Sequence, residues 1–113
     1  PEDEGYVVRK HNRQSIHYED GIVDQLLTPL PNHQLEMLHS RFPPGTYSQQ
    51  SYSHEGEEAG YVLSGRFELW VGERHFQLDE GDSFSFPSRE PHRYGNPGKV
   101  DAVVIWVITP PTF

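Results

Sequence analysis

Short stretches of alternating apolar and polar residues, separated by turn residues, fill the chain from residue 34 onward. Residues 34–42 alternate with a period of two, which is typical of a half-buried β-strand. Residues 83–86 alternate in the same way, and residues 101–109 form a continuous apolar run rich in Val and Ile. No segment keeps a helical period for more than a turn or two, so the pattern predicts an all-β chain.

The turn residues predict how these strands are connected. Residues 59–63 and 67–71 flank a turn around Gly65, which predicts a hairpin between them. A second turn at Gly72 leads into residues 75–78, so three antiparallel strands are expected in succession. Short strands at close and regular spacing are typical of a sandwich or barrel of the jelly-roll kind.

The first thirty residues differ from the rest of the chain. Residues 1–20 are polar and highly charged, and we interpret them as a linker followed by an edge strand. Residues 21–30 hold a short apolar stretch that predicts one more strand, and Pro29 and Pro31 exclude a continuing helix. Because 113 residues suffice for one core but not for two, we expect a single domain over residues 21–113.

Composition narrows the chemistry that the chain can carry. It has no cysteine, which excludes disulfides, thiolate nucleophiles and Cys-bound zinc, so any metal must be bound by His and carboxylate side chains. Seventeen acidic and nine basic residues give a formal net charge of −8, which argues against direct binding to a nucleic acid backbone. The same charge favours cationic partners, although a negative surface can also serve solubility alone.

Two further observations concern the context of the chain. The sequence contains no run of 18 apolar residues and no signal-peptide pattern, so we expect no membrane span and a cytoplasmic location. It begins at Pro1 rather than at a methionine. We therefore interpret it as part of a longer protein, with another domain in front.

Two motifs bring metal-binding residue types to defined places in the chain. They are His54-x3-Glu58-x6-Gly65 and Gly81-x5-Pro87-x4-His92-x3-Asn96. His54 and Glu58 bracket a short turn before one strand, and His92 follows about 30 residues later, so in a small barrel their side chains can converge. Two imidazoles and one carboxylate match the facial ligand set of Fe(II), Mn, Ni or Zn.

The motifs resemble those of the cupin superfamily, and the resemblance covers roughly residues 34–109. It implies a cupin (jelly-roll-type) β-barrel in which His54 and His92 are the histidines of the two motifs and Glu58 is the acidic ligand. Tyr52 stands where the family pattern has its first histidine, so a four-ligand metal set is broken. Tyr52 and His54 are two residues apart on an extended chain, so both side chains are expected to point at the site.

A closer resemblance lies in residues 54–65, 91–94 and 109–113. These segments look like the C-terminal sensor domain of bacterial regulators that join an N-terminal helix-turn-helix to a cupin. The ending Thr112-Phe113 is similar to that of the putrescine-utilisation repressors among them. The resemblance implies a domain that senses a small effector, polyamines in the putrescine case, while a separate N-terminal domain binds DNA.

The residues are consistent with an amine as ligand. A linear diamine has two ammonium ends and an apolar middle, so its site needs carboxylates or carbonyls, aromatic faces and an apolar tube. The candidate ligand-binding residues are Tyr52, His54, Glu58, His92, Tyr94 and Trp106. His54, Glu58 and His92 are also the candidate ligands of a divalent metal (Zn, Ni, Fe or Mn), the alternative being a pocket in which they serve as hydrogen-bonding groups. No catalytic residue is assigned, and the sensor function requires no cofactor.

Three functions stay open on the sequence alone. The leading hypothesis is a non-catalytic, effector-sensing cupin of a transcriptional regulator, with a polyamine or a similar amine as effector. The second is a small metal-dependent cupin enzyme, such as a dioxygenase or isomerase, and the third is a structural dimerisation module. Because bacterial operators are commonly paired half-sites, we also expect a twofold homodimer, with the edge strands near both ends of the chain as candidate surfaces.

Overall fold

The computed structural model describes residues 5–30, 34–48 and 52–111. These residues form nine β-strands and one short 3-10 helix, η2 (Lys10–Asn12). The strands are β1 (Gln14–His17), β2 (Val23–Leu26), β3 (Glu36–Phe42), β4 (Glu57–Ser64), β5 (Phe67–Val71), β6 (Arg74–Leu78), β7 (Ser83–Pro87), β8 (His92–Gly95) and β9 (Ala102–Thr109). Within the described ranges there is no α-helix, and hence no helix suited to cross a membrane, so the all-β prediction is confirmed.

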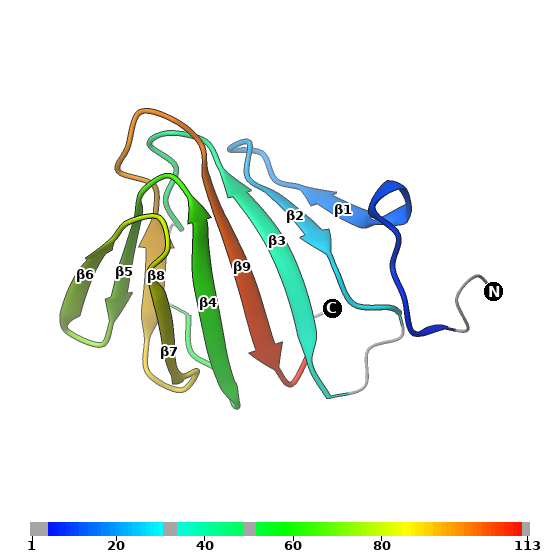
Figure 1. The fold of residues 1–113 in the computed structure, drawn as a ribbon. Coiled ribbons are helices and arrows are strands. Elements are labelled where there is room, and N and C mark those ends of the chain that lie inside the picture. The colour runs from blue at the N-terminus through cyan, green and yellow to red at the C-terminus, as the bar shows by residue number, and fades with distance from the viewer. Residues whose placement is uncertain (1–4, 31–33, 49–51, 112–113) are drawn as a thin grey trace.

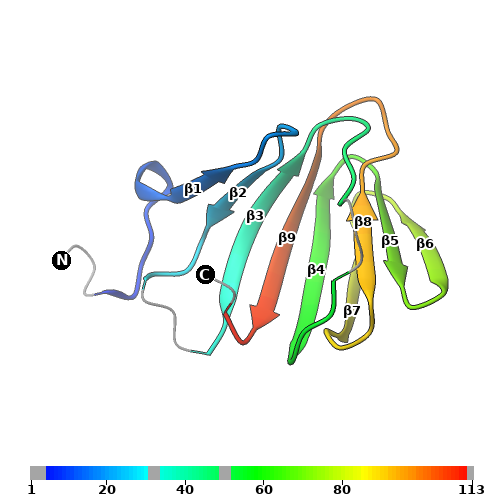
Figure 2. The ribbon, with the colours of Figure 1, turned by 180° about the vertical axis from the view of Figure 1, so that it is seen from behind.

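The strands form two antiparallel sheets that enclose one core. The six-stranded sheet has the order β1-β2-β3-β9-β4-β7, and the three-stranded sheet has the order β6-β5-β8. In Figure 1 the small sheet lies beside β4 and β7, and Figure 2 shows the same arrangement from behind. The ring centroid of Phe67 on β5 lies 5.2 Å from that of Phe42 on β3 and 6.1 Å from that of Trp106 on β9, so both sheets contribute to the same core.

Most of the predicted strands are present. β3, β7 and β9 cover the runs predicted at residues 34–42, 83–86 and 101–109. β5 pairs with β6 across the predicted turn at Gly72. The edge strand expected within the first twenty residues is β1, which pairs with β2 at the end of the large sheet.

The predicted hairpin between residues 59–63 and 67–71 is wrong. These segments belong to β4 and β5, which lie in different sheets. β4 is paired with β7 on one side and with β9 on the other, so it has no free edge to offer β5. Gly65, between them, has a φ of +80°, and the carbonyl oxygen of Asp101 lies only 2.5 Å from where a Cβ atom would be. The chain therefore turns a corner at Gly65 and passes from one sheet to the other.

Several side chains that point into the barrel are polar, although apolar side chains would pack better there. β3 directs Glu36 and Ser40 inward, β4 directs Glu58 inward, and each is at most 5% exposed. The inward positions of β9, by contrast, are apolar. Buried polar groups cost free energy unless they are paired, so such positions in a barrel wall are retained for a structural or functional reason.

Asn96, the last residue of the second motif, joins three segments of the fold. Its side chain is fully buried, and its Nδ2 donates hydrogen bonds of 2.8 Å to the carbonyl oxygens of Phe42 and Val100. Its Oδ1 accepts a 2.8 Å hydrogen bond from the N–H of Gly98. The end of β3, the start of β9 and the loop after β8 are therefore held together by one amide group.

We expect Asn96→Ala to lower the free energy of unfolding by about 2–4 kcal/mol, because it removes three hydrogen bonds and leaves buried carbonyl and N–H groups without partners. Urea unfolding of the purified variant measures this. Gln77→Ala removes an exposed amide from β6 and is the matched control, with an expected change within about 0.5 kcal/mol. Equal stabilities of the two variants would contradict the role given to Asn96.

Candidate functional site

A cavity of about 860 Å³ lies between the two sheets, a size common for small-molecule sites. All six predicted ligand-binding residues line it: Tyr52, His54, Glu58, His92, Tyr94 and Trp106. The structure thus brings together residues that are up to 54 positions apart in the sequence, from Tyr52 to Trp106. Their roles in binding stay a prediction.

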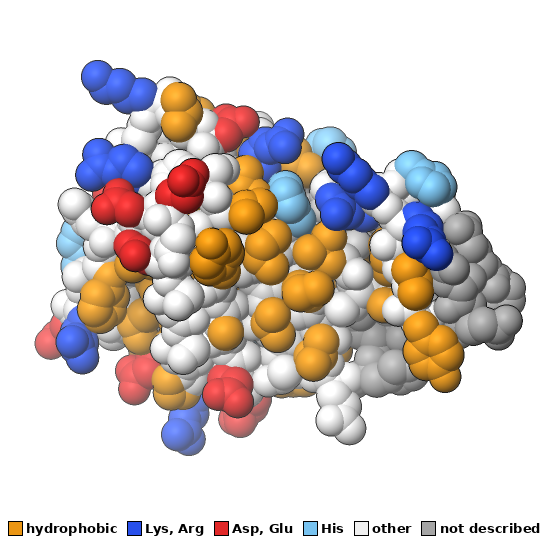
Figure 3. Space-filling model, viewed as in Figure 1, with side chains coloured by type: hydrophobic (Ala, Val, Ile, Leu, Met, Phe, Trp, Pro, Cys, Tyr) orange, Lys and Arg blue, Asp and Glu red, His pale blue; other side chains and the backbone are white. Residues whose placement is uncertain are grey.

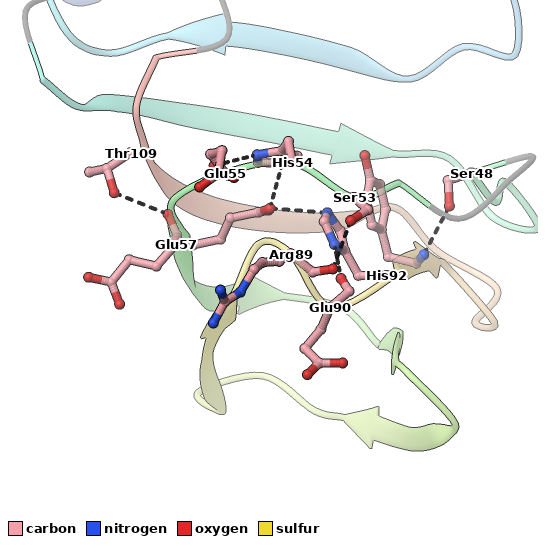
Figure 4. A network of polar contacts seen from close by, with 11 residues as sticks. Ser48, Ser53, His54, Glu55, Glu57, Arg89, Glu90, His92 and Thr109 are labelled. Carbon is pink, nitrogen blue, oxygen red and sulfur yellow. Dashed lines mark hydrogen bonds and ion pairs between the residues drawn. The ribbon is translucent and has the colours of Figure 1, made fainter.

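Backbone hydrogen bonds clamp the first motif onto the second. The N–H of Tyr52 donates to the carbonyl of His92 at 2.8 Å, and the N–H of His92 donates back to Tyr52 at 2.9 Å. Two residues further along, the N–H of His54 donates to the carbonyl of Ser88 at 3.0 Å. The hydroxyl of Ser53 adds a 2.7 Å bond to the carbonyl of Arg89, as Figure 4 shows. This clamp sets the distance between the two histidine side chains.

Two imidazole nitrogens converge on one carboxylate oxygen. Oε2 of Glu58 lies 2.9 Å from Nε2 of His54 and 3.0 Å from Nε2 of His92. The side chains of Glu58 and His92 are 4% and 3% exposed, whereas that of His54 is one-third exposed. The three side chains offer ligand atoms that all lie within 4.8 Å of one another.

The other ring nitrogen of each histidine determines its tautomer. Nδ1 of His54 lies 3.0 Å from the carbonyl oxygen of Glu55, and Nδ1 of His92 lies 2.8 Å from that of Glu90. A carbonyl oxygen only accepts, so both Nδ1 atoms carry a hydrogen. In the neutral form each Nε2 then has a lone pair directed at Oε2 of Glu58. The cluster is therefore complete only when a proton, a metal ion or another cation lies among its three acceptor atoms.

The pKa values of the buried pair reflect this need. Burial is the largest single influence on Glu58 and opposes its ionisation, but the hydrogen bond and charge of His92, together with smaller contributions from Ser88 and His54, hold the pKa of Glu58 below its usual 4.5. Burial is also the largest single influence on His92 and opposes its protonation, but the hydrogen bond to Glu58, the bond to the carbonyl of Glu90 and the charge of Glu58 together raise the pKa of His92 above 6.5. Both shifts favour the ion pair between an ionised Glu58 and a protonated His92.

A divalent metal also fits the geometry of the cluster. Two ligand atoms about 2.1 Å from a metal ion and at right angles to each other lie about 3 Å apart. The Nε2–Oε2 distances of 2.9 and 3.0 Å match this spacing. The tautomers, with Nδ1 bound to backbone carbonyls and Nε2 free to bind, are those of metal-bound histidines. Tyr52, at the place of the fourth ligand, lines the cavity with a side chain 43% exposed.

Aromatic rings form the wall next to the cluster. The ring of Tyr94 lies 5.3 Å from that of Trp106 and 5.6 Å from that of Phe42, centroid to centroid. Burial raises the pKa of Tyr94, and the nearby carboxylates of Asp24 and Glu58 raise it further. The phenol therefore stays neutral. Trp106 is 4% exposed, so it serves both the core and the cavity wall.

The opposite wall consists of residues that the sequence reasoning missed. Tyr18, Glu19, Asp20, Ile22 and Asp24 line the cavity from the segment that connects β1 with β2 and from β2 itself. The sequence predicts residues 1–20, which include Tyr18, Glu19 and Asp20, to be a linker and an edge strand and not part of the site. One signal was available, because Asp24 interrupts an apolar alternation between Ile22 and Leu26.

Comparison with known proteins identifies the fold family. The cupin domain family matches residues 38–108, which is more than half of the chain. The chain belongs to the cupin domain family. The predicted cupin fold is therefore confirmed, and this cupin carries the His54, Glu58 and His92 cluster inside its barrel.

Relatives of this cupin include DNA-binding regulators. The HTH-type transcriptional regulator PuuR of Escherichia coli is 32% identical over 83 residues, which are 74% of this chain and 45% of PuuR. The chain thus spans less than half the length of that relative. The predicted resemblance to the cupin domains of helix-turn-helix regulators is confirmed.

Two solved structures show the same fold at low sequence identity. An RmlC-like cupin from Shewanella frigidimarina has a TM-score of 0.82 and 23% identity, covering 94% of this chain and 91% of that one. The cupin domain of an XRE family transcriptional regulator from Enterobacter cloacae has a TM-score of 0.70 and 23% identity, covering 80% and 97%. At this level of identity the likeness concerns the fold alone.

The Glu58–His92 pair predicts a pH dependence of stability. The pair stabilises the fold fully at pH values between 4.5, the usual pKa of a glutamate, and 6.5, the usual pKa of a histidine. This stabilisation is lost as the pH rises through the raised pKa of His92 or falls through the lowered pKa of Glu58. With a chelator present, we expect the wild type to lose unfolding free energy between about pH 5.5 and pH 8 by more than Glu58→Gln does. Urea unfolding at both pH values tests this, and parallel losses would contradict it.

Proposed function

We propose that this cupin is the effector-sensing domain of a cytoplasmic transcriptional regulator and that it binds a polyamine such as putrescine, without catalysis. In this proposal residues 1–20 are a linker and an edge strand, residues 21–113 are the effector-binding domain, and a separate N-terminal domain contacts DNA. The relation to PuuR, whose name describes an HTH-type transcriptional regulator, supports the regulatory role.

The observation that carries the proposal is the set of three acceptors in the cavity. A primary ammonium group has three N–H donors and one positive charge. Nε2 of His54, Nε2 of His92 and Oε2 of Glu58 offer three acceptors directed at one another, and the cluster needs a cation. An ammonium nitrogen that caps these three atoms would satisfy all of them at once.

The remainder of the cavity suits the carbon chain of such a ligand. Tyr94 and Trp106 present aromatic faces, which attract cations and also accept methylene groups. The formal charge of −8 raises the local concentration of cations around the domain. Charge at the surface alone, however, would give only weak, salt-sensitive binding.

We expect putrescine to bind saturably and to raise the melting temperature of the domain, because a ligand that binds only the folded state stabilises it. Glu58→Gln keeps the size of the side chain but removes its charge, so the affinity should fall by about 1.5–3 kcal/mol. Isothermal titration calorimetry of the metal-free protein at two salt concentrations measures both effects.

Glu57→Gln is the matched control, because Glu57 is the exposed neighbour of Glu58 and carries the same charge. It should leave the affinity nearly unchanged. A fully N-methylated analogue of putrescine keeps the charges but has no N–H donor, so it should bind much more weakly. Binding that disappears at high salt, or whose affinity is unchanged in Glu58→Gln, would contradict the polyamine proposal.

The second candidate function is a metal-dependent cupin enzyme, which the geometry of His54, Glu58 and His92 also favours. A bound metal would supply Lewis-acid or redox chemistry next to the cavity. Metal analysis of the purified protein distinguishes the two functions. Near-stoichiometric Fe or Mn together with turnover of a substrate would support the enzyme, and metal-free protein with full amine affinity would support the sensor.

We also propose that the protein is a twofold homodimer. The outward side chains of β3, β9 and β4 form an apolar face in the middle of the large sheet, visible in Figure 3. Tyr61 and Leu63 on this face are 45% and 46% exposed. Arg41 lies at one end of the face and Glu57 at the other, so an antiparallel second copy would match both apolar and charged parts. The sequence suggested edge strands near both ends of the chain. The last strand, β9, is not an edge strand, because it lies between β3 and β4, and β1 is polar, so the apolar face is the better candidate.

Sedimentation velocity tests the dimer and its surface together. We expect the wild type to be a dimer and Leu63→Glu to be a monomer, because the new carboxylate would be buried in the interface. Ile16→Glu on the exposed edge strand β1 is the control and should stay dimeric. A monomeric wild type at high concentration would contradict the dimer, and a dimer broken only by Ile16→Glu would place the interface at the edge strand.

A further inference from the structure

Asp24 is an inward-facing carboxylate that the cluster around Glu58 does not explain. On β2 it lies between the buried residues Ile22 and Leu26, on the side that faces the cavity. An acid at such a position is costly, because burial separates its charge from water. The carboxylate of Asp24 in the cavity wall therefore needs a group that compensates its charge.

The partners that the protein itself supplies to Asp24 are neutral. The hydroxyl of Tyr18 donates to Oδ2 of Asp24 at 3.3 Å, and Ser40 also forms a hydrogen bond with this carboxylate. Among the described residues, the ion pairs do not include Asp24. Burial raises its pKa, and the nearby charge of Glu36 raises it further despite the two hydrogen bonds. A cation placed beside Asp24 would remove this penalty.

Asp24 and Glu58 lie at different levels of the same cavity. Asp24 is opposite Ser40 on β3, which is opposite Val104 on β9, whereas Glu58 is opposite Ile108 on β9. The four residues from Val104 to Ile108 correspond to about 13 Å along the strand. The charges of both carboxylates act on the phenol of Tyr94, so this ring lies near both of them.

We propose that Asp24 binds the second ammonium group of the effector, so that the cavity selects linear α,ω-diamines over monoamines. This inference rests on the proposed function, in which the cluster of His54, Glu58 and His92 holds the first ammonium group. The carbon chain lies along Tyr94 and Trp106 between the two ends. Given the offset along β9, the two nitrogens lie on the order of 10 Å apart, so the ammonium group at Asp24 belongs to a diamine or polyamine longer than putrescine, whereas putrescine itself is held at the Glu58 cluster alone.

The two carboxylates have different consequences for specificity. Any primary amine can occupy the cluster at Glu58, so that site contributes equally to monoamines and diamines. Only a ligand with a second cation at the right distance reaches Asp24. A diamine that is too short leaves Asp24 unpaired, and a monoamine of equal length places a methyl group beside it, which a half-buried carboxylate disfavours.

The test is calorimetry with α,ω-diaminoalkanes of four to ten carbons and with the alkyl monoamines of the same lengths. For the wild type we expect the preference for diamine over monoamine to rise with length and then to level off. Asp24→Asn keeps the shape and the contacts to Tyr18 and Ser40, and should weaken the longer diamines about ten- to a hundredfold. The affinities for monoamines should stay within about twofold of the wild type.

Glu80→Gln is the matched control, because Glu80 carries the same charge as Asp24 but is exposed and does not line the cavity. Thermal unfolding of each variant without ligand verifies that it is folded. Asp24→Asn with undiminished binding of every diamine would overturn the role of Asp24 while leaving the amine sensor intact, as would equal losses in Glu80→Gln. Absence of binding by any amine to the wild type would overturn the proposed function as well.

Discussion

The carboxylate of Glu58 is buried between two imidazole rings, and the structure around the cavity is arranged to keep it there. The exchange of backbone hydrogen bonds between Tyr52 and His92 places both histidines. The carbonyls of Glu55 and Glu90 then hold each ring with its Nε2 toward the acid. When both imidazoles are neutral, the three atoms that face one another are all hydrogen-bond acceptors. The barrel therefore encloses a cluster that lacks a hydrogen-bond donor or a cation. A proton, a metal ion and an ammonium group are three ways to complete it, and the same positions suit each of them.

The parts of this site that the sequence predicts are those defined by local spacing. His54, Glu58 and His92 stand at fixed offsets within short segments, and alternation along a strand determines which side chains share a face. Strand pairing is a different matter, because it depends on contacts between distant segments. Residues 59–63 and 67–71 read as a hairpin, yet β4 is already paired on both sides by strands that follow later in the chain. Asp24 was missed for the same reason, since only the folding of β2 beside β3 turns its side chain into the cavity.

Within the barrel, packing and binding share the same elements. Trp106 packs in the core against Phe67 and Phe84, at centroid distances of 6.1 and 5.0 Å, and also lines the cavity. Phe84 in turn lies against Gly60, where its ring fills the space that a Cβ atom would need. A larger residue at position 60 would push this group of rings toward the cavity. The shape available to a ligand is therefore set partly by residues that never touch it.

In the described part of the chain, β1 is attached to the barrel through β2 alone, by four residue pairs from Gln14 opposite Leu26 to His17 opposite Val23. All four residues of β1 are exposed, so little apolar burial holds the strand in place. Its attachment therefore depends on how well ordered β2 is. A ligand that orders β2 from the cavity side therefore also increases the fraction of time in which β1 is paired with β2. Binding in the cavity would then change how often β1 detaches from β2. This change would reach the segment that directly precedes β1 in the chain.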